Sequence, residues 1–153
     1  MGVEPSIQSL LKDYRVVGID TVVFVYHFEE RRQYLPFTNT LFEMVERGDL
    51  VGVTSTLTLL EILVKPKRIQ NQEAVEEYLF VFKTFPNLRV RHLDFEVAEK
   101  AAEIRARYRV KTPDAIQIAT ALVEGANAFI TNDKELKKIK ETEVVVISET
   151  LSR

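Results

Sequence analysis

Four acidic side chains lie in or beside apolar segments, where carboxylates are rare unless they are paired or bind a metal. They are Asp20, Glu61, Asp114 and Asp133. If they converge, their mutual repulsion raises their pKa values and destabilises the fold, and a divalent cation removes that cost. Carboxylate oxygens suit Mg²⁺ or Mn²⁺ rather than zinc. The residue types therefore predict an all-oxygen metal site.

The chemistry that such a site supports is phosphodiester hydrolysis. Two metal ions about 3.5–4 Å apart can activate a water molecule and stabilise the leaving oxygen. Basic residues flank three of the four acids in sequence and can hold a nucleic-acid backbone. They are Arg31, Arg32, Arg105, Arg107, Arg109, Lys111, Lys134, Lys137, Lys138 and Lys140. The alternative is that they form solvated helix faces or complement helix C-termini.

Each acid also has a purely structural interpretation. Asp20 and Asp133 stand where helix caps belong, and Asp114 fits a first-turn acid favoured by the helix dipole. Glu61 interrupts the apolar run 59–64, which predicts a helix buried nearly all round. A buried lone carboxylate is costly, so the alternative there is an ion pair with a distant Arg or Lys. Glu61 is the strongest of the four indications.

Composition excludes several other kinds of site. The chain has no cysteine, which removes disulfides, thiolate metal sites and cysteine nucleophiles. It has no glycine-rich phosphate loop and no Gly-x-Ser-x-Gly elbow. Its two histidines, His27 and His92, are weak catalytic candidates. No apolar run approaches a membrane span, and residues 1–12 lack a signal-peptide layout, which predicts a cytoplasmic protein.

Strand and helix patterns alternate along the 153 residues, which predicts one domain, 1–153, with a lead-in at 1–14. Strands are predicted at 15–19, 50–54, 88–93, 128–131 and 144–147. Residues 22–28 are β-branched and aromatic, but the preceding Asp20-Thr21 pair favours a helix. A helix over 36–47 ends at Gly48, and the Glu61 helix ends before Pro66. Further helices are predicted at 71–85, 94–108 and 133–139, and another begins at Pro113, with Thr112 as its cap, and ends at Gly125.

This alternation predicts a three-layer α/β/α sandwich with a mainly parallel central sheet. In open α/β sheets, ligands bind beyond the carboxyl ends of the strands. Asp20 and Asp133 lie at the carboxyl ends of strands, while Glu61 lies one to two turns into a helix and Asp114 in a first helical turn. All four acids are therefore expected at one edge of the sheet.

The order and spacing of four segments resemble the PIN-domain family and, within it, the VapC-type toxin ribonucleases. The segments are 19–21, 55–62, 112–121 and 131–133, within a resemblance that spans about 15–147. The resemblance implies that Asp20, Glu61, Asp114 and Asp133 bind Mg²⁺ or Mn²⁺ and that Thr131 orients a neighbouring acid. It implies endonuclease action on RNA, a homodimer and, for a toxin, an antitoxin partner. Val22 departs from the family pattern, where Asn is frequent.

The chain itself also points to a partner, because the helix over 71–85 is apolar on more than one face between Tyr78 and Phe85. The alternative is that this helix is fully buried. Two other functions fit the predicted fold. One is a non-catalytic module that binds nucleic acid or protein. The other is a phosphoryl-accepting receiver domain, although the adjacent acids and late Lys of that class are missing.

Overall fold

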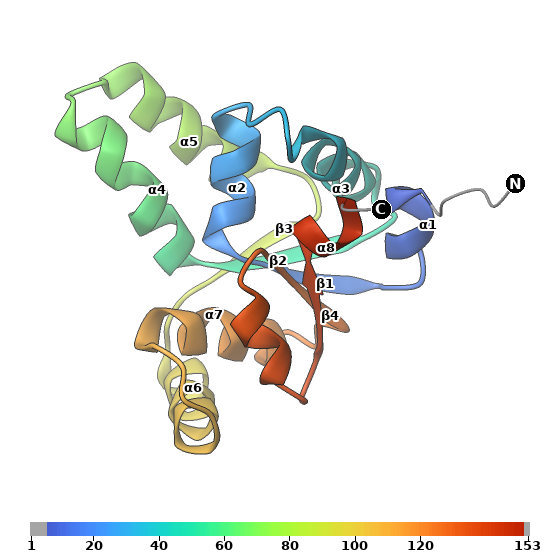
Figure 1. Cartoon of the computed structure of the whole chain (residues 1–153). Coiled ribbons are helices and arrows are strands. Elements are labelled where there is room, and N and C mark those ends of the chain that lie inside the picture. Colours follow the sequence, from blue (N-terminus) through green and yellow to red (C-terminus); the bar gives the residue numbers. More distant parts are fainter. Residues whose placement is uncertain (1–5, 152–153) are drawn as a thin grey trace, which may run out of the picture.

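The computed structural model describes residues 6–151 as a parallel sheet covered by helices on both faces (Figure 1). The strands are β1 Val16–Ile19, β2 Val51–Ser55, β3 Leu88–Arg91, β4 Ala128–Thr131 and β5 Glu143–Val146. The helices are α1 Ile7–Leu11, α2 Thr21–Phe28, α3 Leu35–Arg47, α4 Thr56–Arg68, α5 Gln72–Thr84, α6 Phe95–Arg107, α7 Thr112–Val123, the 3₁₀ helix η1 Lys134–Lys138 and α8 Ile147–Leu151. The predicted α/β/α class is confirmed.

The five strands follow the order β3-β2-β1-β4-β5, and all of the neighbouring pairs are parallel. The chain moves outward in one direction from β1 to β3, then continues on the other side of β1 with β4 and β5. The carboxyl ends of β1 and β4 therefore form the switch point where open α/β sheets bind ligands. A receiver-type sheet has the order 2-1-3-4-5, so the strand order argues against the receiver alternative.

Two apolar clusters lie on opposite faces of the sheet. Side chains from α1, α2 and α3 pack with β1, β4 and β5 on one face, and α4 and α5 add Ile62 and Phe82. On the other face, α6 and α7 pack against Phe129 and against Leu136 of η1. Figure 1 shows α6 and α7 below the sheet and the remaining long helices above it. The sheet thus separates α7 from α2 and α4 except at its carboxyl edge.

Local side-chain chemistry explains why several helices begin where they do. The side chain of Asp20 accepts a hydrogen bond from the Thr21 amide at 2.9 Å and caps α2. This cap, together with burial of Val23 and Phe24, outweighs the β-propensity of 22–28. Ser55 caps α4 in the same way, accepting from the Leu57 amide at 3.0 Å.

Several predicted boundaries were wrong. Pro66 lies inside α4 rather than beyond its end, because α4 continues to Arg68 and buries the proline ring. Thr112 is the first residue of α7 rather than its cap, which is Lys111. The last strand ends at Val146, and Ile147 begins α8, which the sequence patterns did not predict.

The β1 strand approaches α7 so closely that only glycine fits at position 18. A Cβ atom on Gly18 would lie 2.5 Å from the Cβ of Ala121 and 2.9 Å from Cδ1 of Phe129. Real Cβ atoms do not approach other atoms that closely. Ala121 is part of α7, so its Cβ atom can move away only if the helix moves. Gly18 therefore sets the distance between β1, which leads to Asp20, and α7, which carries Asp114.

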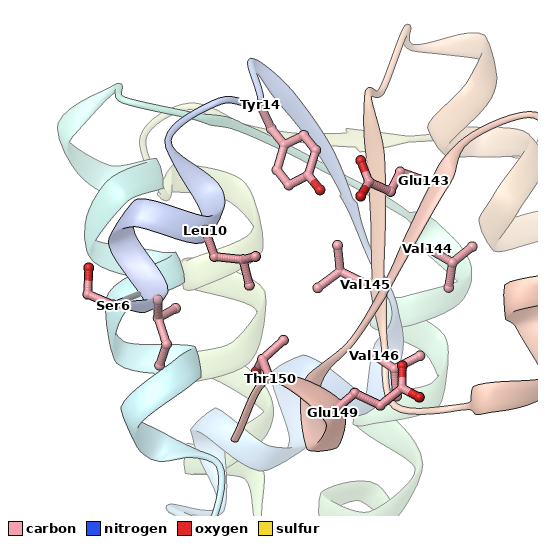
Figure 2. Close-up of a pocket in the computed structure, with 10 residues that line it drawn as sticks. Ser6, Leu10, Tyr14, Glu143, Val144, Val145, Val146, Glu149 and Thr150 are labelled. Carbon is pink, nitrogen blue, oxygen red and sulfur yellow. The ribbon is translucent and has the colours of Figure 1, made fainter. Parts of the chain in front are cut away.

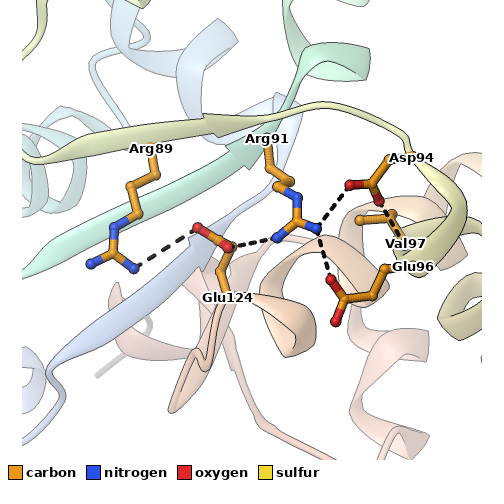
Figure 3. Close-up of polar contacts among 6 residues, drawn as sticks. All are labelled: Arg89, Arg91, Asp94, Glu96, Val97 and Glu124. Carbon is orange, nitrogen blue, oxygen red and sulfur yellow. Dashed lines mark hydrogen bonds and ion pairs between the residues drawn. The ribbon is translucent and has the colours of Figure 1, made fainter.

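An ion-pair network ties the opposite end of α7 to the edge strand β3 (Figure 3). The Arg91 guanidinium donates to Glu124 at 2.8 Å, and to Asp94 and Glu96 at 2.9 Å each. Asp94 also caps α6 by accepting from the Val97 amide. These carboxylates raise the pKa of Arg91 further above its already high value, so it stays charged. The network fixes α6 and α7 relative to the sheet.

Candidate metal-dependent active site

Asp20 lies half-buried where β1 meets α2, at the switch point of the sheet. One carboxylate oxygen accepts from the Thr21 amide, and the other accepts from the Thr131 hydroxyl at 2.8 Å. Burial raises the pKa of Asp20 to about 6 against these two hydrogen bonds, which lower it. The negative charges of Asp114 and Glu61 raise it further. Two of the other predicted acids are therefore close enough to raise the pKa of Asp20.

Thr131 is the last residue of β4 and is fully buried. Its hydroxyl donates to Asp20 and accepts from the Asp133 amide at 3.2 Å. Asp133 is exposed and caps η1, accepting from the Glu135 amide at 3.0 Å. One hydroxyl thus links the first predicted ligand to the turn that carries the last.

Asp114 lies half-buried in the first turn of α7. Burial raises its pKa, the charges of Asp133 and Glu61 raise it as well, and Lys111 opposes them. Asp114 is therefore linked electrostatically to the other three acids, through Asp133 and Glu61 directly and through its effect on Asp20. The four predicted acids share one neighbourhood at the carboxyl edge of the sheet.

Glu61 is exposed, which corrects the prediction that its helix is apolar and buried all round. Helix α4 buries Thr58, Ile62, Leu63 and Pro66, but it leaves Leu60 at 60 % exposed and Val64 at 42 %. Glu61 makes no ion pair among residues 6–151; instead it accepts a 2.6 Å hydrogen bond from the Thr21 hydroxyl. The apolar residues around it in sequence face solvent, so the sequence argument from burial cost does not hold.

A buried network of hydroxyl and amide groups lies beneath Glu61, and sequence analysis missed it. Thr54, Thr58 and Gln117 are all buried, and Thr21 is partly buried. Gln117 Nε2 donates to Thr58 at 2.8 Å and to Thr21 at 3.0 Å. The sequence signal was Gln117 itself, a polar residue inside the apolar run 115–121.

The acids fit a metal in donor chemistry but do not form a closed cage by themselves. No group of three acidic or histidine side chains within residues 6–151 stands close enough to enclose an ion. Mg²⁺ usually keeps several waters and uses only one or two carboxylates, so a closed protein cage is not required. All available donors are oxygens, and two of the carboxyls carry raised pKa values partly because other acids lie near. A divalent cation would relieve that repulsion.

Five of the ten predicted basic residues bond to other groups through their side chains: Arg31, Arg105, Arg107, Lys137 and Lys138. Arg31 pairs with Glu29 at 2.7 Å, Arg107 with Glu141 at 2.6 Å and Lys137 with Glu149 at 2.8 Å. Lys111 is different, because its charge lowers the pKa of Asp114. It is thus the basic residue that the structure places beside the acids.

The two histidines lie apart from this chemistry. His27 Nδ1 shares a hydrogen bond with the Thr38 hydroxyl at 3.0 Å, and burial lowers the pKa of the imidazole. The ring also packs against Phe42 with the centroids 4.7 Å apart. His92 is exposed just after β3. Among the described residues, neither histidine is a neighbour that shifts the pKa of Asp20 or Asp114.

A cavity of about 290 Å³ lies away from the acids, between α1, β5 and α8 (Figure 2). Its wall includes Tyr14, whose hydroxyl hydrogen-bonds to Glu143; burial and this neighbour raise the pKa of Tyr14. None of the five predicted site residues lines it. The carboxyl edge of the sheet therefore remains the candidate site.

The sequence profile described as "PIN domain" matches residues 17–142, which include all five candidate residues. No curated protein matches the sequence. No helix within residues 6–151 has the length and hydropathy needed to cross a membrane.

Three solved structures are similar in fold. A toxin-antitoxin complex from Klebsiella pneumoniae matches with a TM-score of 0.63 and 22 % identity, covering 86 % of this chain and 96 % of the other. VapBC2 from Rickettsia felis, bound to a promoter DNA fragment, matches with a TM-score of 0.68 and 15 % identity. The match covers 86 % of this chain and 98 % of the other. DNA-bound VapBC from Salmonella typhimurium matches with a TM-score of 0.63 and 19 % identity. The match covers 86 % of this chain and 97 % of the other.

Proposed function

Because the chain belongs to the PIN domain family, a nuclease family that typically uses divalent metal ions, we propose that it is a metal-dependent endoribonuclease. We further propose Mg²⁺ or Mn²⁺ as the ion and RNA phosphodiester bonds as the substrate. Asp20, Glu61, Asp114 and Asp133 would hold the metal, and Thr131 would orient Asp20. The all-oxygen donor set and the absence of cysteine in the chain favour these hard cations.

A divalent ion held by these carboxylates would supply an activated water and stabilise the leaving oxygen. The protein contributes the positions of the charges. Thr131 holds one oxygen of Asp20 and the turn that leads to Asp133. Thr21 holds Oε1 of Glu61. Lys111, beside Asp114, is placed to attract a phosphate of the RNA backbone.

One observation carries the proposal: Asp20 lies half-buried at the switch point, hydrogen-bonded to Thr131, and the charges of Asp114 and Glu61 raise its pKa. The test is cleavage of a fluorescently labelled single-stranded RNA by purified protein. We expect cleavage with Mg²⁺ or Mn²⁺ and none in EDTA, and Asp114→Asn should lower the rate at least ~10-fold because it removes a ligand charge. Equal cleavage with and without EDTA would reject the metal mechanism.

We also propose that an antitoxin protein binds this chain. The support is that similar structures are described as toxin-antitoxin complexes, two of them bound to DNA. Exposed Leu60 and Val64, which flank Glu61 on α4, offer apolar contact surface beside the site. Co-expression with the product of the adjoining reading frame tests the idea: a purified complex that no longer cleaves RNA is expected, and separate elution would contradict it.

A homodimer through α5 is the remaining proposal. Its support is Phe80, which is 67 % exposed, whereas Val75 and Phe82 on the other face of α5 are buried. Burying such a ring against a second copy removes apolar surface from water. We expect light scattering at micromolar concentration to give a dimer, and Phe80→Glu to give a folded monomer. A wild-type monomer would exclude this interface, and Phe95→Glu, at the 96 % exposed start of α6, is the matched control.

A further inference from the structure

The buried network beneath Glu61 has two fixed ends, and these decide the direction of every hydrogen bond in it. At one end Thr21 Oγ1 lies 2.6 Å from Glu61 Oε1. At the other end Thr54 Oγ1 lies 2.9 Å from the Ile19 carbonyl oxygen. An ionised carboxylate and a backbone carbonyl only accept. Thr21 must therefore donate to Glu61, and Thr54 must donate to Ile19.

The remaining hydroxyl follows from these two. Thr58 Oγ1 lies 2.7 Å from Thr54 Oγ1. The single hydrogen of Thr54 is already used, so Thr58 donates to Thr54. The hydroxyl hydrogens of Thr21 and Thr58 are then both donated to other groups. Their Oγ1 atoms lie 3.2 Å apart, but neither has a hydrogen to donate to the other. Both oxygens can only accept from a third group.

Gln117 is that third group. It is 3 % exposed on α7, and its Nε2 lies 3.0 Å from Thr21 and 2.8 Å from Thr58. An amide NH₂ has two hydrogens, one for each hydroxyl, whereas the amide oxygen has none to give. The network is complete when the Gln117 amide points its NH₂ group at Thr21 and Thr58. In that orientation the Thr21 hydroxyl is held with its hydrogen directed at Glu61.

We propose that Gln117 is a positioning residue that sets the metal affinity of the site by holding Glu61 through Thr21. The proposal rests on the metal-dependent function above. Thr21 fixes the position of Oε1, and Oε2 accepts no hydrogen bond from residues 6–151, so Oε2 is the freer oxygen to face a cation. The same network ends on the carbonyl of Ile19, the residue before Asp20, so it joins the placement of Glu61 to that of Asp20. Helices α2, α4 and α7 meet at this single amide.

The test measures Mn²⁺ binding to the purified full chain by isothermal titration calorimetry, with no RNA present. Gln117→Leu keeps most of the side-chain volume but removes both donors. We expect its dissociation constant for Mn²⁺ to rise about 10-fold, which is typical when a group that orients a ligand is lost. Thr58→Val should have a similar effect, while Thr58→Ser, which keeps the hydroxyl, should bind as the wild type does.

Thr120→Val is the matched control, because Thr120 is buried on the same helix and its hydroxyl bonds, within residues 6–151, to the Ile116 carbonyl alone. It should leave the Mn²⁺ affinity unchanged. If Gln117→Leu lowers the melting temperature but binds Mn²⁺ like the wild type, Gln117 is only a packing residue and the proposal fails. If the wild type itself binds no Mn²⁺, the proposed metal site fails and the positioning role falls with it. Should Gln117→Leu not fold, the two Thr58 variants decide the question.

Discussion

Asp20→Asn is expected to lower the rate of metal-dependent RNA cleavage by about 100-fold or more. The same change should make the metal-free protein more stable. Asn is close in shape and can still cap α2 through its side-chain oxygen. It removes the charge that burial and the neighbouring Asp114 and Glu61 disfavour. A catalytic carboxylate that costs stability is a common feature of active sites. The opposite signs of the two effects separate this role from a purely structural one.

The raised pKa of Asp20 predicts how the free energy of unfolding changes with pH. The pKa of Asp20 rises from an ordinary 3.8 to about 6 on folding, so the folded state binds more protons between these values. Stability of the metal-free wild type should therefore fall as pH rises from about 4 to 6, by at most about 3 kcal/mol. At pH 7 we expect Asp20→Asn to raise the free energy of unfolding by about 1–2 kcal/mol, because Asn avoids that charge.

Urea unfolding in EDTA at pH 4 and pH 7 measures this. The gain from Asp20→Asn should be present at pH 7 and nearly gone at pH 4, where the wild-type Asp20 is already neutral. Mn²⁺ should raise the melting temperature of the wild type but not that of the variant, because ligands stabilise only the state that binds them. A variant that is less stable than the wild type at pH 7 would show that the Asp20 carboxylate stabilises the fold, contrary to this account.

Gly18→Ala is expected to cost about 2–3 kcal/mol of stability, the upper part of the range for overpacking a core. The added methyl group would lie 2.5 Å from the Cβ of Ala121, and that atom moves only if α7 moves. Moving α7 away from β1 also carries Asp114 away from Asp20. We therefore expect weaker Mn²⁺ binding in whatever fraction of the variant remains folded.

Gly52→Ala is the matched control in the adjacent strand. Its Cβ would lie 3.0 Å from Cδ1 of Ile19 and 3.3 Å from Cδ1 of Leu88, which are the ends of flexible side chains. Small rotations of those side chains relieve the contact, so the expected change is within about 1 kcal/mol. Chemical denaturation of both variants measures the difference. Equal stabilities would mean that α7 does not pack against β1 as closely as described.

The sequence by itself determined the layers, the direction of the sheet and the edge at which the acids lie. Strand and helix periods alternate, and parallel strands with crossover helices place all carboxyl ends together. Asp20 follows β1 directly and Asp133 lies two residues after the end of β4, so their placement needed no tertiary information. The cap at Asp20 even predicted a helix over 22–28 against β-propensity, because capping is a local interaction.

Only the tertiary structure decided which surroundings each acid has. Glu61 sits among Leu and Ile in sequence, yet α4 packs through its other face and leaves Glu61 and Leu60 exposed. Pro66 reads as a helix end, but burial against the core extends α4 past it. Apolar composition cannot tell which face of a helix is covered, because that depends on elements distant in the chain.

The same holds for Gln117, an isolated polar residue in an apolar run whose purpose no spacing rule reveals. Its two partners, Thr21 and Thr58, are 96 and 59 residues away along the chain. They meet it only because Gly18 lets α7 approach β1 at the carboxyl edge of the sheet. Local propensities set the elements, whereas long-range packing set the hydrogen bonds that hold the acids in place.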